Sequence, residues 1–352
     1  MKYCIVHMVF VWLFVAVLPT VKGFVSPRLV TAHLRSDPTF SPFHPTTKSL
    51  VPPPTNLYAV PPEIWTSFLP PAMGFVKSEW TVSYGYGFAT SLSALSLLMR
   101  TAITPDNPIF PVQATALIFY GLRLNAFLYV RNRVSSRMQE FQKNMEERAA
   151  ARGSRLSRAP TVLGCGFLYF ALYTPLLLTS MISGSDVVPP VSLLAMKGLA
   201  ALQWCGFLMG AVADSTKTYV KKMEKDENFL VTSGIFSLLR HPNYTGEIIA
   251  WTCNFLLGTI AGSYLLRNKF SGKILGYLGL NWIGWVGIVF VLLGATGSLE
   301  ERQKSSYGNT EKYKKWVDST WSGWYLPKTK KASEPHAITM DGVVEEERGS
   351  GI

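Results

Sequence analysis

Histidine is scarce in this sequence, and its scarcity excludes a class of metalloenzymes. The chain has 352 residues and five histidines. His7, His33 and His44 lie in an N-terminal stretch that we interpret below as a presequence, and His336 lies in a polar C-terminal tail. Only His241 remains in the body, whereas histidine-box and di-iron centres need several imidazoles at helical spacing. We therefore expect no metal site.

Cysteine is also sparse, and its spacing excludes a second class of site. Of the four cysteines, Cys4 lies in the presequence, and Cys165, Cys205 and Cys253 are single thiols in apolar stretches. No CxxC pair occurs, which argues against a zinc site or a disulfide framework. We interpret the three thiols of the body as small buried hydrophobic side chains.

Charged residues are few and apolar residues are many. The chain is 16% charged and 48% hydrophobic, whereas soluble domains average about 25% charged residues. The apolar residues form six blocks, each near the length of helix that crosses ~30 Å of hydrocarbon. We therefore predict an all-α, polytopic membrane helix bundle with about six transmembrane helices, whose first partner is the lipid bilayer. The blocks are residues 82–99, 110–130, 161–183, 191–213, 247–266 and 274–294.

The first 59 residues resemble a targeting segment. Residues 1–23 have the basic start, apolar run and small-residue end of a signal peptide, and residues 24–59 have the hydroxyl-rich, acid-poor composition of a transit peptide. In tandem they resemble the bipartite presequence of algae whose plastids have extra membranes, in which a Phe follows the signal cleavage point, as Phe24 does here. We expect a plastid membrane reached through the ER. The alternative is a secretory signal with a disordered linker, and hence the ER membrane.

The remaining chain divides into a lead-in (60–80), a membrane domain (81–327) and a polar tail (328–352) that we expect to be disordered. Residues 131–158, which we expect to be a loop, carry eight basic residues and should stay on the cis side of the membrane. Residues 214–246 and the C-terminal segment would share that side. The presequence has five basic residues and one acid, so that the net charge of +12 falls to +8 without it. A charge of that size fits membrane topology and phosphate contacts, and no basic–aromatic array points to nucleic acid. Two glycine pairs should let neighbouring helices approach closely: Gly206-x-x-x-Gly210 and Gly258-x-x-x-Gly262.

The stretch that opens the fifth apolar block combines a helix start with polar side chains. Pro242 suits the first helical position. The free amides and positive dipole end of such a helix, beside Arg240, favour an anionic group such as a phosphate or carboxylate. Asn243 and Glu247 are four residues apart and share a face. A carboxylate that enters a membrane span is costly, which makes Glu247 a functional candidate.

A second polar cluster follows the sixth apolar block. Two short spans return it to the membrane face of the first cluster, so that one pocket should contain both. The mixture of cations, amide, carboxylates and phenols suits a charged, hydrogen-bonding cofactor better than a lipid alone. The residues expected in this pocket are Arg240, His241, Asn243, Tyr244, Glu301, Arg302 and Tyr313.

The pattern of these clusters is specific. Residues 234–247 read Gly-Ile-Phe-Ser-Leu-Leu-Arg-His-Pro-Asn-Tyr-Thr-Gly-Glu, Glu-Glu-Arg follows at 300–302, and Tyr-Gly-x-x-x-x-Tyr begins at 307. Tyr-Gly-Leu-Arg-Leu at 120–124 and Ala-Asp-x-x-Lys at 213–217 belong to the same set. Together they resemble the steroid 5-alpha-reductase C-terminal family, and more narrowly its domain-of-unknown-function-1295 branch, over about residues 80 to 327.

This resemblance implies a membrane enzyme that binds NADPH in its C-terminal half (214–327). It would reduce a carbon–carbon double bond in a hydrophobic substrate such as a sterol, an isoprenoid or a lipid enone. Arg240 and Arg302 would contact cofactor phosphates. The ribose or the nicotinamide amide would be bound by Asn243, Tyr244 and Glu247. His241 would pair with a phosphate or orient Tyr313, with Glu301 in the same pocket. A donor must also reach a carbonyl conjugated with the double bond, and the candidates on the second apolar block are Tyr120, Arg123 and Asn125.

Other interpretations stay open. A neighbouring branch, isoprenylcysteine carboxyl methyltransferase, uses the same Arg-His-Pro and Glu-Glu elements to hold S-adenosylmethionine, although Asn243 with Glu247 is closer to the reductase pattern. A non-catalytic membrane protein is the third interpretation. Single residues also have structural alternatives: Arg240 as a lipid-headgroup anchor, His241 and Pro242 as a helix cap, Glu300 and Arg302 as an exposed pair, Tyr313 as an interfacial residue and Arg123 as a counter-ion.

Overall fold

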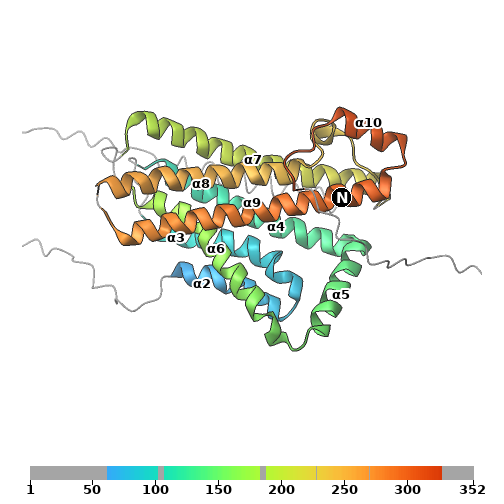
Figure 1. Ribbon diagram of the computed structural model, residues 1–352, viewed down its shortest axis with the longest axis horizontal. Coiled ribbons are helices and arrows are strands. Elements are labelled where there is room, and N and C mark those ends of the chain that lie inside the picture. Colours follow the sequence, from blue (N-terminus) through green and yellow to red (C-terminus); the bar gives the residue numbers. More distant parts are fainter. Residues whose placement is uncertain (1–61, 102–106, 183–187, 227, 269, 327–352) are drawn as a thin grey trace, which may run out of the picture. The chain divides into compact units, whose positions relative to one another are not determined.

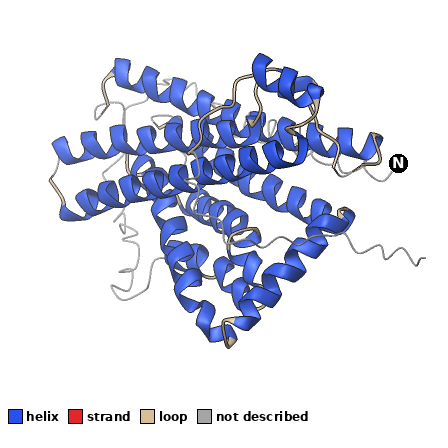
Figure 2. Ribbon diagram, turned by 45° about the vertical axis from the view of Figure 1, so that its right-hand side comes forward, coloured by secondary structure: helices blue, strands red, loops and turns tan. Residues whose placement is uncertain are grey.

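The helices of this protein follow its apolar segments. The computed structural model describes residues 62–101, 107–182, 188–226, 228–268 and 270–326, so that the expected presequence and the polar tail lie outside the described residues. Within the described part, every regular element is a helix (Figure 2), which confirms the expected all-α membrane helix bundle. The longer helices are α2 (Pro62–Phe68), α3 (Tyr84–Arg100), α4 (Ile109–Val134), α5 (Ser136–Ala151), α6 (Ala159–Ser180), α7 (Pro190–Met223), α8 (Pro242–Asn268), α9 (Gly272–Tyr307) and α10 (Glu311–Ser319). Short 3₁₀ turns are η1 (Pro70–Phe75), η2 (Ser78–Thr81), η3 (Arg155–Arg158) and η4 (Gly234–Ser237).

All six predicted apolar blocks are helical, but fewer than six qualify as membrane spans. Four helical stretches are long and apolar enough to cross a bilayer: Arg155–Ser180, Pro190–Met223, Pro242–Asn268 and Gly272–Tyr307. The expected number of about six is therefore four by length and composition. α3 has 17 residues, short of the ~20 that a span needs. α4 is long enough, but polar side chains such as Arg123, Asn125 and Arg131 interrupt it.

Glycine allows the central helices to approach one another. α7, α8 and α9 run side by side, and α6 packs against α8 and α9 (Figure 1). A Cβ on Gly206 of α7 would lie 2.5 Å from the carbonyl oxygen of Gly246 of α8. A Cβ on Gly258 would lie 2.6 Å from the backbone of Pro175 in α6. The expected close packing at both glycine pairs is confirmed, because a larger side chain at either position would force the helices apart.

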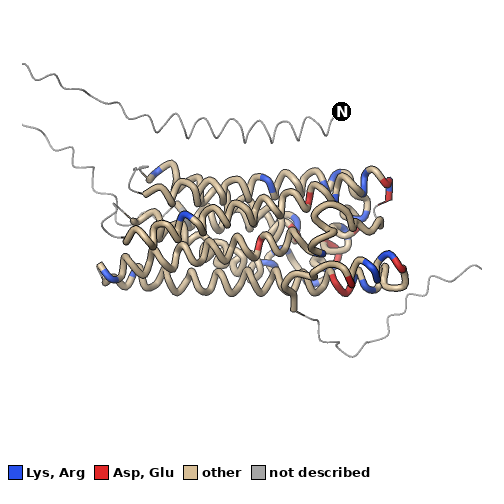
Figure 3. The backbone as a smooth tube through the Cα atoms, turned by 90° about the horizontal axis from the view of Figure 1, so that it is seen from above, with Lys and Arg blue, Asp and Glu red and all other residues tan. Residues whose placement is uncertain are grey.

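Charged side chains gather at one end of the bundle, where α4, α7 and α9 finish and α8 begins (Figure 3). We call this the polar end. Arg137 donates a hydrogen bond of 3.1 Å from Nη1 to Oδ1 of Asn228, and the Tyr307 hydroxyl donates to the carbonyl oxygen of the same Asn228. Three stretches distant in sequence thus meet here, which confirms that residues 131–158, residues 214–246 and the C-terminal segment share one side.

Residues 131–158 are not the expected loop, because they contain α5. The Ser135 hydroxyl caps its first turn by accepting from the Met138 amide at 3.2 Å. Glu146 braces the helix from its other end, where its carboxylate accepts from the Ser78 amide at 2.9 Å and from Arg158 Nη2 at 2.7 Å. The mixed charges of this stretch are typical of a loop, but here they lie on a helix, where Lys143 pairs with Glu147 one turn away.

The Glu146 brace should weaken as the pH falls. The hydrogen bond from the Ser78 backbone, reinforced by Arg158, holds the pKa of Glu146 below its ordinary value. Its stabilising contribution is therefore fully present above the ordinary carboxyl pKa and is lost as the pH falls through the lowered one. We expect Glu146→Gln to weaken the attachment of α5 by about 1 kcal/mol, a figure kept small because the carboxylate is partly exposed.

Limited proteolysis within residues 131–158 checks this expectation. Glu146→Gln should be cut faster than the wild type at neutral pH, and the two should converge in acid. Glu147→Gln is the matched control, because its carboxylate is 63% exposed and lies 3.9 Å from Lys143. Equal cleavage of the two variants at neutral pH would show that Glu146 does not brace the helix.

Candidate functional site

The segment before α8 is held by the C-terminal end of the described chain. The Arg240 amide donates to the Trp321 carbonyl oxygen at 2.8 Å, and Leu239 forms an isolated parallel bridge with Trp321. Pro242 then begins α8, where its missing N–H costs nothing because the first amides of a helix have no intrahelical acceptor. The opening turn of α8 is thus anchored from outside the helix.

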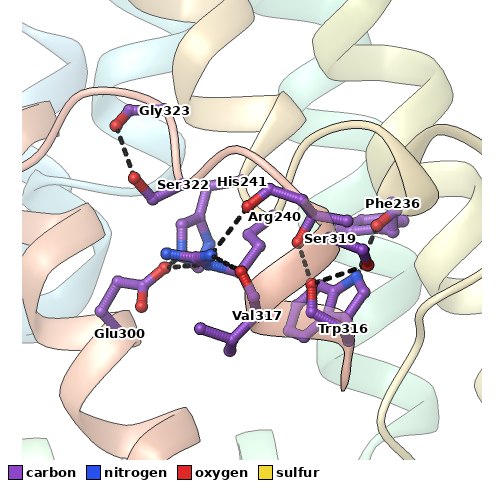
Figure 4. Close-up of polar contacts among 10 residues, drawn as sticks. Phe236, Arg240, His241, Glu300, Trp316, Val317, Ser319, Ser322 and Gly323 are labelled. Carbon is purple, nitrogen blue, oxygen red and sulfur yellow. Dashed lines mark hydrogen bonds and ion pairs between the residues drawn. The ribbon is translucent and has the colours of Figure 1, made fainter. Parts of the chain in front are cut away.

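Glu300 of α9 connects the two predicted clusters (Figure 4). Its Oε1 accepts from Arg240 Nε at 2.9 Å and lies 2.6 Å from His241 Nε2. Arg240 Nη1 donates to the carbonyl oxygens of Val317 and Thr320 at 3.0 and 2.9 Å. We call this arrangement the Glu300 clamp. It confirms that the stretch before α8 and the stretch after the sixth apolar block converge at one end of the bundle.

The clamp occupies much of the hydrogen-bonding capacity of Arg240. Its Nε and Nη1 atoms are directed at protein groups, and the residue is only 8% exposed. His241 is almost fully buried, and its Nδ1 has no hydrogen-bond partner within the described residues. These two residues therefore join chain segments, and their predicted contacts with cofactor phosphates stay predictions.

We expect loss of the Glu300 carboxylate to destabilise the fold. Glu300→Ala would leave Arg240 and His241 buried without an acid, and breaking a buried ion pair from one side costs about 3–5 kcal/mol. Thermal unfolding of the purified protein in detergent measures the effect. Glu301→Ala is the matched control, because the neighbouring side chain is exposed and lies outside the clamp. A melting temperature that falls equally in both variants would contradict this assignment.

A second polar network lies deeper in the bundle. Arg123 of α4 pairs through Nη1 with Asp214 of α7 at 2.5 Å, and Asn243 of α8 donates to the same carboxylate at 3.4 Å. Arg123 is buried, yet its Nε and Nη2 have no hydrogen-bond partner among the described residues. Because buried donors are rarely left without an acceptor, these atoms mark a place for a ligand or water.

An acid–phenol pair lies beside this network. The Tyr120 hydroxyl donates to Glu247 Oε2 at 2.8 Å, and the Tyr120 ring stacks on Phe207 of α7 with centroids 4.3 Å apart. Tyr86 and Trp251 pack around the same ring at 5.7 Å each. The Tyr86 hydroxyl interacts with Tyr120 and Trp251, but neither it nor Trp251 Nε1 forms a hydrogen bond of good geometry in the described part of the chain. The pair thus lies in an aromatic surrounding that retains unsatisfied donors.

Cations from three helices lie on the outer side of this network. Arg131 at the end of α4 and Arg302 of α9 both interact electrostatically with Lys217 of α7 and with the Tyr244 phenol of α8. Tyr244 interacts in turn with the carboxylates of Asp214 and Glu247. We call Arg131, Lys217 and Arg302 the cation group. It would attract an anion at the polar end, next to the buried acids.

The structure divides the predicted site residues into two neighbouring groups. Asn243, Tyr244 and Glu247 lie with Tyr120 and Arg123, whereas Arg240 and His241 belong to the clamp. Tyr313 of α10 is within electrostatic range of Glu300 and Arg240, and burial raises the pKa of its phenol. Glu301 and Arg302 are exposed.

Sequence reasoning missed four residues of these groups. Asp214 and Lys217 belong to the resemblance but have no expected role, Arg131 is expected only as a basic residue of a loop, and Glu300 only as one of an exposed pair with Arg302. The signal that could have found the first two is charge at the end of an apolar block, because ionisable residues in a membrane helix seldom face lipid.

The fold and the site together define an all-α integral membrane protein with a polar network inside its helix bundle. A family model described as "Protein of unknown function (DUF1295)" matches residues 76–320, and the chain belongs to this family. Comparison with curated proteins gives no match, and comparison with solved structures gives none.

Proposed function

We propose that this protein is a membrane-bound, NADPH-dependent reductase of a carbon–carbon double bond in a hydrophobic substrate. The observation that carries the proposal is the order of polar groups from the polar end inward. Along α4, Arg131 precedes Arg123 and then Tyr120, and along α7 Lys217 precedes Asp214. The cation group is therefore outermost, the Arg123–Asp214 pair follows, and the Tyr120–Glu247 pair lies deepest. This order suits a cofactor that is anionic at one end and reacts with an apolar substrate at the other.

The residues present fit such a cofactor. NADPH carries several phosphates, and the cation group together with the unpartnered Nε and Nη2 of Arg123 offers more donors than the nearby carboxylates accept. Arg131, Lys217 and Arg302 would bind phosphate, and Asn243 and Tyr244 would hydrogen-bond the sugar or amide. When bound, NADPH supplies a hydride. In this proposal Arg240 is a positioning residue, which acts through Glu300 on the opening turn of α8.

Tyr120 and Glu247 would handle the proton. With substrate bound, a protonated Glu247 carboxyl would donate to the Tyr120 oxygen, which would free the single Tyr120 hydroxyl hydrogen. That hydrogen would be donated to a carbonyl oxygen conjugated with the double bond, and so draw electrons away from the carbon to be reduced. The reduction also requires one proton, which Tyr120 would deliver from its hydroxyl and recover from the Glu247 carboxyl. The surrounding rings of Tyr86, Phe207 and Trp251 favour an apolar substrate such as a sterol, an isoprenoid or a lipid enone.

Titration of the purified protein with two cofactors tests this function. We expect NADPH to bind and S-adenosylmethionine not to bind, because the latter has no phosphate for the cation group. Arg302→Ala should weaken NADPH binding by about tenfold or more, since a hydrogen bond to a charged group contributes about 1.5–3 kcal/mol. Arg267→Ala is the control, because it removes an equally exposed positive charge at the last turn of α8, at the end of the bundle away from the cation group.

The other outcomes separate the alternatives. Binding of S-adenosylmethionine without NADPH would support a methyltransferase. Binding of neither would support a non-catalytic membrane protein. If Arg302→Ala and Arg267→Ala bind NADPH with equal affinity, the cation group is not part of the cofactor site.

We also propose that the protein resides in a plastid membrane. The support is that a signal-like segment (1–23) precedes a transit-like segment (24–59), and that the second segment begins with Phe24. A fluorescent fusion of residues 1–60 should enter the plastid in an alga with complex plastids, and Phe24→Ala should divert it. Secretion of the unaltered fusion, or its retention in the ER, would support the alternative address.

A further inference from the structure

The turn between α5 and η3 exposes an unusual combination of side chains at the membrane boundary. Arg148, Arg152, Arg155 and Leu156 are all exposed, and we call these four residues the arginine corner. The first candidate membrane span begins at Arg155, so the corner lies directly before a helix long and apolar enough to enter the bilayer. α5 runs across the direction of α7, α8 and α9 (Figure 1), as a helix lying along a membrane surface does.

The arginines of the corner form no ion pair with an acid of the described residues. Glu146 pairs with Arg158 at 2.7 Å and Glu147 lies 3.9 Å from Lys143, so the acids nearest in sequence are directed elsewhere. Arg155 interacts electrostatically with Glu146, but none of the three corner arginines forms an ion pair with a described residue. Arg148 of α5 and Arg152, which directly follows the helix as its C-cap, are four residues apart in the chain, a spacing at which like charges repel. An anionic group between them would remove this repulsion.

The apolar side chains of the corner point to the source of that anion. Leu156 is 74% exposed and Phe141 is 48% exposed. Phe141, Met145, Arg148 and Arg152 follow at helical spacing, so that one face of α5 changes from apolar to cationic toward the corner. A soluble anion would gain nothing from Leu156. A phospholipid offers acyl chains to the leucine and a phosphate to the guanidinium groups, whose planar donor forks match phosphate oxygens.

We infer that the arginine corner binds the head group of an anionic phospholipid in the surrounding bilayer. Gly153 allows this geometry, because its φ of +123° reverses the chain between Arg152 and Arg155 in a conformation that other residues rarely adopt. The corner would fix the depth of α5 and of the start of the first span. The inference does not depend on the reductase proposal, because the cation group and the corner share no residue.

Spin-labelled lipids test the inference on the full-length protein in phosphatidylcholine bilayers. We expect labelled phosphatidylglycerol to associate more strongly than labelled phosphatidylcholine. Arg148→Gln/Arg152→Gln should reduce this preference by about fivefold for each arginine removed, the effect of one cation near an anionic membrane surface. Both side chains are exposed, so circular dichroism should show an unchanged helix content.

Two controls decide what the result means. Lys143→Gln removes a cation from another face of α5 and should leave the preference for phosphatidylglycerol unchanged. If this variant loses the preference as much as the double arginine variant does, the corner contributes only nonspecific positive charge. Excess inorganic phosphate should not release phosphatidylglycerol, and complete release would assign the corner to a free anion. Equal association of the two lipids with the wild type would overturn the inference.

Discussion

Glu300 is the contact on which the arrangement of the candidate site depends. One carboxylate oxygen accepts from Arg240 and lies against His241, while Arg240 also reaches two carbonyl oxygens near the end of the described chain. The charged groups are largely buried. In the protein interior, the attraction within an ion pair offsets the cost of desolvation only when the geometry is near ideal and further hydrogen bonds are made. Arg240 meets both conditions, through its 2.9 Å contact with Glu300 and its hydrogen bonds to Val317 and Thr320. The clamp therefore joins α9, the C-terminal segment and the opening turn of α8 into one unit, and that turn carries Asn243, Tyr244 and Glu247.

The network behind the clamp is expensive to maintain, which is why it indicates function. A bundle that needed only stability would replace Arg123, Asp214 and Glu247 by apolar side chains, since buried ions contribute little net stability. Instead the chain retains them and leaves Arg123 Nε and Nη2, the Tyr86 hydroxyl and Trp251 Nε1 without a hydrogen bond of good geometry in the described part. A site that binds a ligand needs free donors and reactive side chains, and the unsatisfied donors and the Tyr120–Glu247 pair between α4 and α8 supply both. The buried amides of Gln113 and Asn254, in contrast, are hydrogen-bonded to each other.

Local patterns anticipated much of this molecule. The apolar blocks predict where the helices lie, and the glycine pairs at Gly206 and Gly258 predict two places where helices pack closely. The clusters around Arg240 and residues 300–302 are predicted to converge, and they do. The failures have physical causes. The expected loop at residues 131–158 is wrong because its local charges do not reveal that Glu146 reaches Ser78, a contact between residues far apart in sequence. Among the described residues, length and composition alone select four of the six blocks as candidate spans, because α3 has 17 residues and polar side chains interrupt α4.

The sequence by itself determined that the protein is a helical membrane protein, where its helices lie and which polar residues enter them, because hydrophobic length and the position of proline and glycine act locally. Only the tertiary structure decided the partners. Glu300 and Glu301 are adjacent in the chain, yet one closes the clamp and the other is exposed, because successive residues of a helix point about 100° apart. Which of the two faces Arg240 depends on how α9 is rotated against α8, and that rotation is set by packing across the whole bundle.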